Sequence, residues 1–276
     1  MALSGVKTKV DNRSNFSIKT DALQRLLMVN TLSKVLPLYI VTEYPKSGGS
    51  WLSQILAEYL DVPFPRNQRP KITSSLMHGH MSYSPFMSNV FCLHRDGRDI
   101  IASQYYHSLF QNDKNSPNQV ERCRSDLNFL DYDDVQNNLG QFIEYVYQRD
   151  MASKSPFRCS WPEFESGWSG KDCVHLRYED LVSRGVDVLV PAIEKVTGSP
   201  VDIDKLSEIY EKFSFQNQSK RKPGEENRSS FLRKGQPGDW KEKFNFESAN
   251  VFDQYAGEKL IALGYEPDRA WIDNLK

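Results

Sequence analysis

The sequence contains no apolar run approaching the length of about 18 residues that a membrane-spanning helix requires. Residues 1–20 are polar and contain neither the apolar core nor the small-residue cleavage site of a secretion signal. Cysteines occur only at Cys92, Cys123, Cys159 and Cys173, without the spacing typical of a metal site. Because free thiols suit a reducing compartment, we expect a cytoplasmic protein with no membrane span and no bound metal.

An excess of positive charge is also missing. Lys and Arg number 35 against 36 Asp and Glu, so the net charge is −1. Such a chain is not expected to bind nucleic acid, and any anion site must be local. The 276 residues are 39% hydrophobic and 26% charged, as in soluble globular proteins. We expect a partly ordered N-terminal arm over residues 1–20 and one domain over residues 21–276.

Apolar runs of strand length alternate with runs of helical periodicity. The run at residues 36–44 is almost continuously apolar, as in a strand of a parallel sheet covered on both faces. Residues 50–60 place their apolar side chains in one stripe, which predicts a helix. Further strands are predicted at 75–81, 89–94 and 172–178, and further helices at 21–33, 97–110, 135–151, 179–197, 203–213 and 248–263. The alternation predicts a single-domain α/β fold with a mainly parallel central sheet flanked by helices.

The most informative segment follows the first predicted strand and reads Tyr-Pro-Lys-Ser-Gly-Gly-Ser-Trp over residues 44–51. Its two glycines allow a tight turn, and unpaired amides at the start of the next helix favour an anion. Lys46 adds positive charge, although it precedes the glycines, whereas the lysine of the common P-loop follows them. The segment predicts a phosphate-binding loop. A helix-entry turn with an unrelated lysine is the alternative.

Two further segments combine cations with turns. Arg95 follows the strand predicted at 89–94, and Ser103 lies in the helix after it, so both could reach one phosphate. Arg233 and Lys234 open a glycine-containing basic loop that ends at Trp240, and such a loop can surround an anion. The alternatives are an Arg95 paired with a nearby aspartate and a basic loop that is merely solvated.

These three segments, in this order, resemble the motifs of the cytosolic-type sulfotransferases, which use 3′-phosphoadenosine-5′-phosphosulfate (PAPS). Residues 44–51 resemble the family's 5′-phosphosulfate loop, usually Tyr-Pro-Lys-Ser-Gly-Thr-Thr-Trp. Residues 95–107 resemble its 3′-phosphate motif, and residues 233–241 are close to its most distinctive string. The resemblance spans residues 40–241. It implies a P-loop NTPase-like sulfotransferase fold and transfer of a sulfuryl group from PAPS to a hydroxyl acceptor, with PAP as product and no metal.

The resemblance also implies a role for each matching residue. The 5′-phosphosulfate would be held by Lys46, Ser47, Gly48, Gly49 and Ser50. The adenine would lie between Trp51 and Phe215, with Tyr178 at its edge and Ser214 among the donor-binding residues. The 3′-phosphate would be held by Arg95, Ser103, Arg233, Lys234 and Gly235. Lys46 and Ser103 would also take part in catalysis.

Transfer to a hydroxyl group needs a base for the acceptor's proton. By the family's register the catalytic histidine is His80, in Met-His-Gly-His-Met over residues 77–81. His78 takes the place of the family's lysine and stays an alternative base. His94, His107 and His175 are interpreted as structural.

Other features leave the acceptor and the assembly open. The family's dimerisation stretch is not matched after Lys241, so that dimer is not expected. Residues 111–134 and the aromatic segment around Trp161 and Trp168 are candidates for a lid, although the tryptophans could equally pack in the core. The acceptor could be a small molecule or a glycan. Two other function classes remain, a kinase and a non-catalytic nucleotide-binding protein.

Overall fold

The structure, a computed structural model, describes residues 15–66, 72–152 and 159–275. The strands are β1 (Leu38–Glu43), β2 (Ser75–Gly79), β3 (Val90–His94) and β4 (Val174–Arg177). The α-helices are α1 (Asn15–Thr31), α2 (Gly49–Tyr59), α3 (Gly97–Leu109), α4 (Pro117–Leu127), α5 (Val135–Met151), α6 (Trp161–Trp168), α7 (Tyr178–Arg184), α8 (Val186–Thr197), α9 (Ile203–Lys212), α10 (Phe215–Ser219) and α11 (Phe246–Ala262). Short 3-10 helices, η1 (Asp239–Glu242) and η2 (Arg269–Trp271), lie on either side of α11. Within the described residues, none of the helices combines the length and apolarity needed to cross a membrane.

The four strands seen in the described residues form one sheet in the order β2-β1-β3-β4, and every pairing is parallel. Parallel strands bring all their carboxyl ends to one edge, which is where open α/β sheets bind ligands. The first phosphate-loop candidate follows β1, Arg95 follows β3, and Tyr178 follows β4. The predicted α/β fold with a parallel sheet is confirmed.

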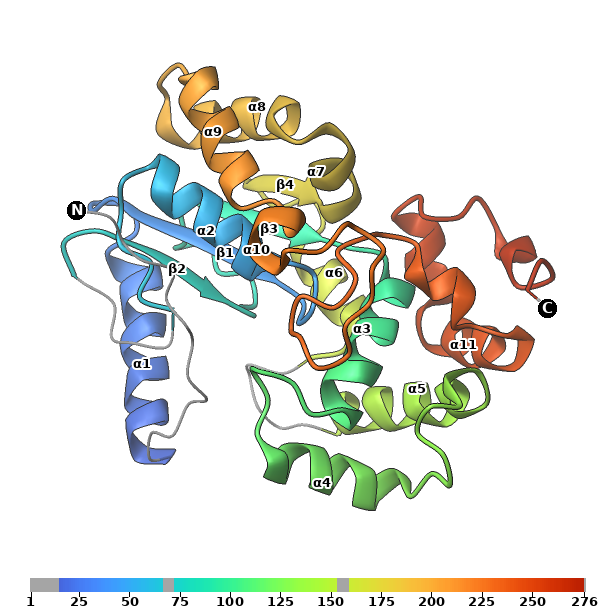
Figure 1. The fold of residues 1–276 in the computed structure, drawn as a ribbon. Coiled ribbons are helices and arrows are strands. Elements are labelled where there is room, and N and C mark those ends of the chain that lie inside the picture. Colours follow the sequence, from blue (N-terminus) through green and yellow to red (C-terminus); the bar gives the residue numbers. More distant parts are fainter. Residues whose placement is uncertain (1–14, 67–71, 153–158, 276) are drawn as a thin grey trace.

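Helices cover both faces of this sheet (Figure 1). Successive strand residues point to opposite faces, so Cys92 contributes to one core while its neighbours Phe91 and Leu93 contribute to the other. The first core packs β1 and β3 against α3, α5, α6 and α11, and the second packs them against α2, α8 and α9. The near-continuous apolar character of the strands follows from this two-sided burial.

Two segments without clear periodicity turn out to contain helices. In residues 111–134, Ser116 caps α4 and Pro117 opens it, as expected for these residue types at a helix start. α4 buries Val120, Cys123 and Leu127. The aromatic segment forms α6, and both Trp161 and Trp168 are 1% exposed, so the core-packing alternative holds for them.

The N-terminal region differs in detail from the expectation. Residues 1–14 of the predicted arm lie outside the described residues, and α1 begins at Asn15, before the helix predicted over 21–33. The boundary of the domain at residue 21 stays a prediction.

Candidate functional site

The chain leaves β1 at Glu43 and turns sharply into α2. The Ser47 amide and hydroxyl both donate to the Tyr44 carbonyl, at 3.2 and 2.8 Å, which closes the turn. Lys46 and Gly48 have positive φ angles of 78° and 104°, and Gly48 is the N-cap of α2. A Cβ at Gly48 would lie 2.8 Å from the Tyr178 ring, so only glycine fits this backbone and this approach. The start of α2 therefore faces the ligand edge of the sheet.

A buried carboxylate lies behind this turn. Glu43 is 4% exposed, accepts a hydrogen bond from the Gly49 amide and bonds to His78 Nε2 at 3.0 Å. Burial pushes the pKa of Glu43 up, but His78, His80 and the Gly49 amide together outweigh burial, so the pKa is lowered overall. A Cβ at Gly49 would lie 2.6 Å from the Glu43 carboxyl carbon and 2.8 Å from His78 Nε2. The Glu43–His78 pair thus accounts for glycine in place of the threonine usual in the resembling motif.

His80 has a defined tautomer. Its Nδ1 lies 2.9 Å from the Glu43 backbone carbonyl, which can only accept, so Nδ1 carries the proton. The lone pair is then on Nε2, the nitrogen a base needs. His80 is exposed, yet desolvation by the protein around it lowers its pKa against the opposing charge of Glu43. The neutral form, which can take up a proton, is therefore favoured.

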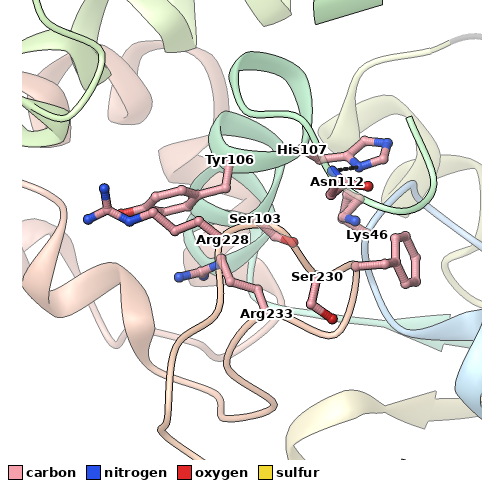
Figure 2. Close-up of a pocket in the computed structure, with 9 residues that line it drawn as sticks. Lys46, Ser103, Tyr106, His107, Asn112, Arg228, Ser230 and Arg233 are labelled. Atoms are coloured by element: carbon pink, nitrogen blue, oxygen red, sulfur yellow. Dashed lines mark hydrogen bonds between the residues drawn. The ribbon is translucent and has the colours of Figure 1, made fainter. Parts of the chain in front are cut away.

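Lys46 lies in a pocket lined by residues of three separate segments (Figure 2). Its Nζ is 3.9 Å from the centre of the Phe231 ring, which covers it. Burial lowers the pKa of Lys46 to about 7, against the opposing charge of Glu43, and Arg95 and Arg233 lower it further. The complete lining is Lys46, Ser103, Tyr106, His107, Asn112, Arg228, Ser230, Phe231 and Arg233. With several cations and hydroxyls, the pocket has the chemistry of an anion site.

Arg95 joins this pocket to an aromatic wall. Its Nη1 donates to the Lys46 carbonyl at 2.9 Å, and its guanidinium lies 4.2 Å from the centre of the Tyr178 ring. Tyr178 meets Trp51 edge-on at 6.0 Å. The indole nitrogen of Trp51 donates to the Phe213 carbonyl at 2.9 Å, which fixes the ring. Lys46, Arg95 and Tyr178, which each follow a strand of the sheet, therefore lie together.

Arg233 and Lys234, the adjacent cations of the basic loop, lie in different places. Arg233 pairs with Glu226 and Asp239 and reaches the Lys46 pocket. Lys234 pairs instead with Asp239 at 2.6 Å and Glu242 at 2.8 Å, beside a second depression. Its charge is therefore not brought into the Lys46 pocket.

Both ends of this loop are anchored. Gly235 has a φ of 62°, and a Cβ there would overlap the Phe215 ring, so loop and ring are in close contact. Ser214 caps α10 by accepting from the Asn217 amide at 3.3 Å. Buried Trp240 anchors the other end, where its backbone amide donates to Asp99 at 3.1 Å.

In the loop of residues 44–51, Ser50 Oγ accepts a hydrogen bond from Arg66 at 3.4 Å.

Sequence reasoning missed Glu43 and Arg228 as members of this region. Glu43 could have been noticed as an acidic residue at the end of an apolar strand, because a buried charge requires a partner. Arg228 gives no such signal. It lines the pocket only because the loop of residues 219–239 crosses α3.

The match to known proteins agrees with this geometry. The sequence model of the family described as Sulfotransferase domain matches residues 64–264. The chain belongs to the sulfotransferase family. The family match begins after the loop of residues 44–51, so that loop is assigned by its own residues and geometry. The predicted family, and with it a sulfotransferase enzyme, is confirmed.

Relatives of this sulfotransferase cover most of its length. The 3-alpha-hydroxysteroid sulfotransferase of Cavia porcellus is 23% identical over 270 residues, 83% of this chain and 84% of that protein. Sulfotransferase 2A1 of Homo sapiens is 23% identical over 268 residues, 82% of this chain and 85% of that protein.

Solved structures share the fold. Mouse sulfotransferase SULT7A1 complexed with PAP matches with a TM-score of 0.60 and 16% identity, over 88% of this chain and 90% of that one. Retinol dehydratase in complex with androsterone and the inactive cofactor PAP matches with a TM-score of 0.57 and 12% identity, over 87% and 85%.

Proposed function

We propose that this sulfotransferase takes the sulfuryl group from PAPS and transfers it by in-line displacement to a hydroxyl acceptor, giving a sulfate ester and PAP. The observation that carries the proposal is the Lys46 pocket. Lys46, Ser103 and Arg233 come from three distant segments, and each belongs to one of the three motifs that the resemblance assigns to the donor. Their convergence at the carboxyl edge of the sheet supports a donor that carries separate phosphate groups.

Buried hydrogen-bond donors near Lys46 support an anionic ligand, although carboxylates also pair with both arginines of this region, Asp99 with Arg95 and Glu226 and Asp239 with Arg233. Lys46 Nζ is covered by an aromatic ring, and its pKa of about 7 reflects the burial of a cation among other cations. Arg95 Nε and Arg233 Nε are buried without a hydrogen-bond partner in the part of the chain that the structure describes. Buried donors without acceptors are rare in folded proteins, and the phosphate oxygens of PAPS would supply acceptors for this region.

The aromatic wall suits the adenine. Trp51 and Tyr178 lie beside the loop that would hold the 5′-phosphosulfate, and Phe215 packs under Gly235 of the loop that would hold the 3′-phosphate. Flat aromatic faces bind a purine by stacking. Lys234 fits less well than Arg233, because it does not line the Lys46 pocket and its ammonium group is engaged by Asp239 and Glu242.

Each residue then has a physical task. PAPS, when bound, supplies a sulfuryl group attached to a phosphate leaving group, and charge builds on the leaving oxygen during transfer, as in phosphoryl transfer. Lys46 would stabilise that charge, and the amides at the start of α2, other than the Gly49 amide that donates to Glu43, would hold the phosphosulfate. The Ser47 hydroxyl keeps the turn closed through its bond to the Tyr44 carbonyl. Ser103 would help to hold the 3′-phosphate. His80 Nε2 would accept the acceptor's proton, because Nδ1 is already occupied by the Glu43 carbonyl.

The choice of base is tested by comparing two histidine variants. His78 Nε2 is engaged by the Glu43 carboxylate, whereas His80 Nε2 is the lone-pair nitrogen of its ring. We expect His80→Ala to lower kcat by about 100-fold to 10,000-fold, the usual contribution of a general base, with PAP affinity unchanged in calorimetry. His78→Ala should keep most of its turnover. An inactive His78→Ala beside an active His80→Ala would reverse the assignment.

The acceptor belongs to the class of small-molecule hydroxyl compounds in this proposal. Relatives named as hydroxysteroid sulfotransferases and a structural neighbour that binds androsterone support this class over a glycan. A panel of phenols, alcohols, steroids and sugars, each assayed for PAP formation, tests it. Transfer to sugars alone would contradict it.

A further inference from the structure

A second cluster of chemically active side chains lies at the β3–β4 end of the sheet, on the face of the first core. Cys92 and His94 are two residues apart on β3, so their side chains point to the same face. His175 on β4 is the register partner of Cys92 and brings a second imidazole to that face. The Cys92 sulfur and one nitrogen of each histidine all lie within 4.8 Å of one another.

The protons on the two histidines can be placed from their other contacts. His175 Nε2 lies 2.9 Å from the Lys171 backbone carbonyl, which can only accept, so Nε2 carries the proton. His94 Nδ1 lies 2.5 Å from a Glu165 carboxylate oxygen and donates to it. In the neutral rings, His94 Nε2 and His175 Nδ1 therefore both have lone pairs, and these two atoms are 2.9 Å apart.

Two lone pairs at this distance repel each other unless a proton or a cation lies between them. A shared proton would make one ring cationic beside buried Glu165. A metal ion satisfies both nitrogens and also explains the position of the Cys92 sulfur, which a shared proton does not need. Histidine ligands of metals commonly donate their other nitrogen to a carboxylate or a backbone carbonyl. Glu165 and the Lys171 carbonyl provide these two kinds of acceptor.

We propose that Cys92 Sγ, His94 Nε2 and His175 Nδ1 bind a zinc ion. One thiolate and two imidazoles bind zinc in preference to calcium or magnesium. Three protein ligands leave the fourth tetrahedral position for water. With bonds of about 2.0–2.3 Å, tetrahedral ligand atoms lie about 3.3–3.8 Å apart, so the cluster needs only small side-chain movements. As the sulfur–zinc bond forms, the thiol proton passes to solvent. The ion would cross-link strand β4 to β3 directly before Arg95.

The proposed zinc site differs from the expectation of no bound metal. The sequence did not reveal it because its ligands lie far apart in the chain. The ligands come from positions 92, 94 and 175, and only the pairing of β3 with β4 brings them together. Cys92 is buried, whereas His175 is exposed on β4, which gives an ion a route of entry. The zinc proposal does not depend on the proposed donor or acceptor.

The test is metal binding by the full-length, tag-free protein. After treatment with a chelator, the protein is titrated with zinc in competition with a chromophoric chelator, and in parallel with cobalt(II) as a spectroscopic probe. We expect one equivalent of zinc and a thiolate-to-cobalt charge-transfer band. Cys92→Ser should abolish the band and weaken zinc binding by more than about 100-fold, beyond the effect usual for outer partners of a ligand. His175→Gln, at an exposed position, should also weaken it strongly.

Cys123→Ser is the matched control, because Cys123 is another buried free thiol, in α4. It should bind zinc as the wild type does. Zinc should raise the melting temperature of the wild type and of Cys123→Ser but not of Cys92→Ser. If the wild type binds zinc no more tightly than Cys92→Ser, or cobalt gives no thiolate band, the proposal is wrong and the 2.9 Å contact is a shared proton.

Discussion

The pKa of Lys46 leads to a pH dependence of donor binding with a definite sign. In the structure this pKa is about 7 because burial, Arg95 and Arg233 disfavour the charged form more than Glu43 and Asp113 favour it. A bound phosphate would favour the charged form and raise the pKa. Binding then requires a proton on Lys46, so PAP affinity is expected to fall as the pH rises above 7.

The size of the effect follows from the protonated fraction. For a pKa of about 7, that fraction falls from about one half at pH 7 to about one hundredth at pH 9, so affinity should fall by about 50-fold, or about 2.3 kcal/mol. The ligand's own titration adds little, since a phosphate's second pKa is about 6. His107, whose pKa burial lowers to about 3, and His80, whose pKa is also lowered, stay neutral throughout this range.

Calorimetry of PAP binding at several pH values between 7 and 9, in buffers of different ionisation enthalpy, measures both the affinity and the proton uptake. Lys46→Arg is the matched control, because a guanidinium stays charged over this range. Its PAP affinity should not vary with pH, whatever its absolute value. A wild-type affinity that stays constant from pH 7 to 9, or a Lys46→Arg variant with the same slope as the wild type, would refute the reasoning.

Two substitutions test residues around the proposed donor site. Gly235→Ala should lose most PAP binding in calorimetry, because the added Cβ would displace the Phe215 ring. Gly238→Ala is the control and should keep PAP binding, because Gly238 also has a positive φ, of 85°, but has open space around an added Cβ. Equal losses of PAP binding in the two variants would contradict the role of Phe215. Glu43→Gln should lower the free energy of unfolding in urea at pH 7 by about 1–3 kcal/mol, because charge-assisted hydrogen bonds to Gly49 and His78 are weakened. Since the pKa of Glu43 is lowered by folding, its stabilisation is present above the ordinary pKa and is lost as the pH falls through the lowered value. The gap between wild type and Glu43→Gln should therefore shrink in acid, and a constant gap would count against hydrogen bonds that depend on the Glu43 carboxylate.

The fold was predictable where local pattern and burial agree. β1 and β3 are continuous apolar runs because both faces of the sheet are covered, and α2 and α9 each carry a clear apolar stripe. α4 was missed because it is a mostly polar helix that buries only Val120, Cys123 and Leu127. These three residues have helical spacing, but the stripe is narrow among polar residues, and the stability of α4 comes from packing on α3 and α5 and from its Ser116 cap.

The residues of the candidate site that belong to recognisable motifs were predictable from the sequence. Lys46 and Arg95 lie at strand ends, and the parallel topology alone brings them together. Glu43 was not predicted, although two departures from the resembling motifs, Gly49 and His78, are both explained by it. Such compensation among three residues is visible only when their side chains are seen in contact.

The most direct test of the central claim is an assay of transfer from PAPS. The wild type, incubated with PAPS and the hydroxyl panel, should form PAP and an equal amount of a sulfate ester, identified by mass spectrometry. Lys46→Ala should form neither at a comparable rate, and ATP should not replace PAPS. A wild type that binds no PAP, or that transfers phosphate from ATP instead, would contradict the account.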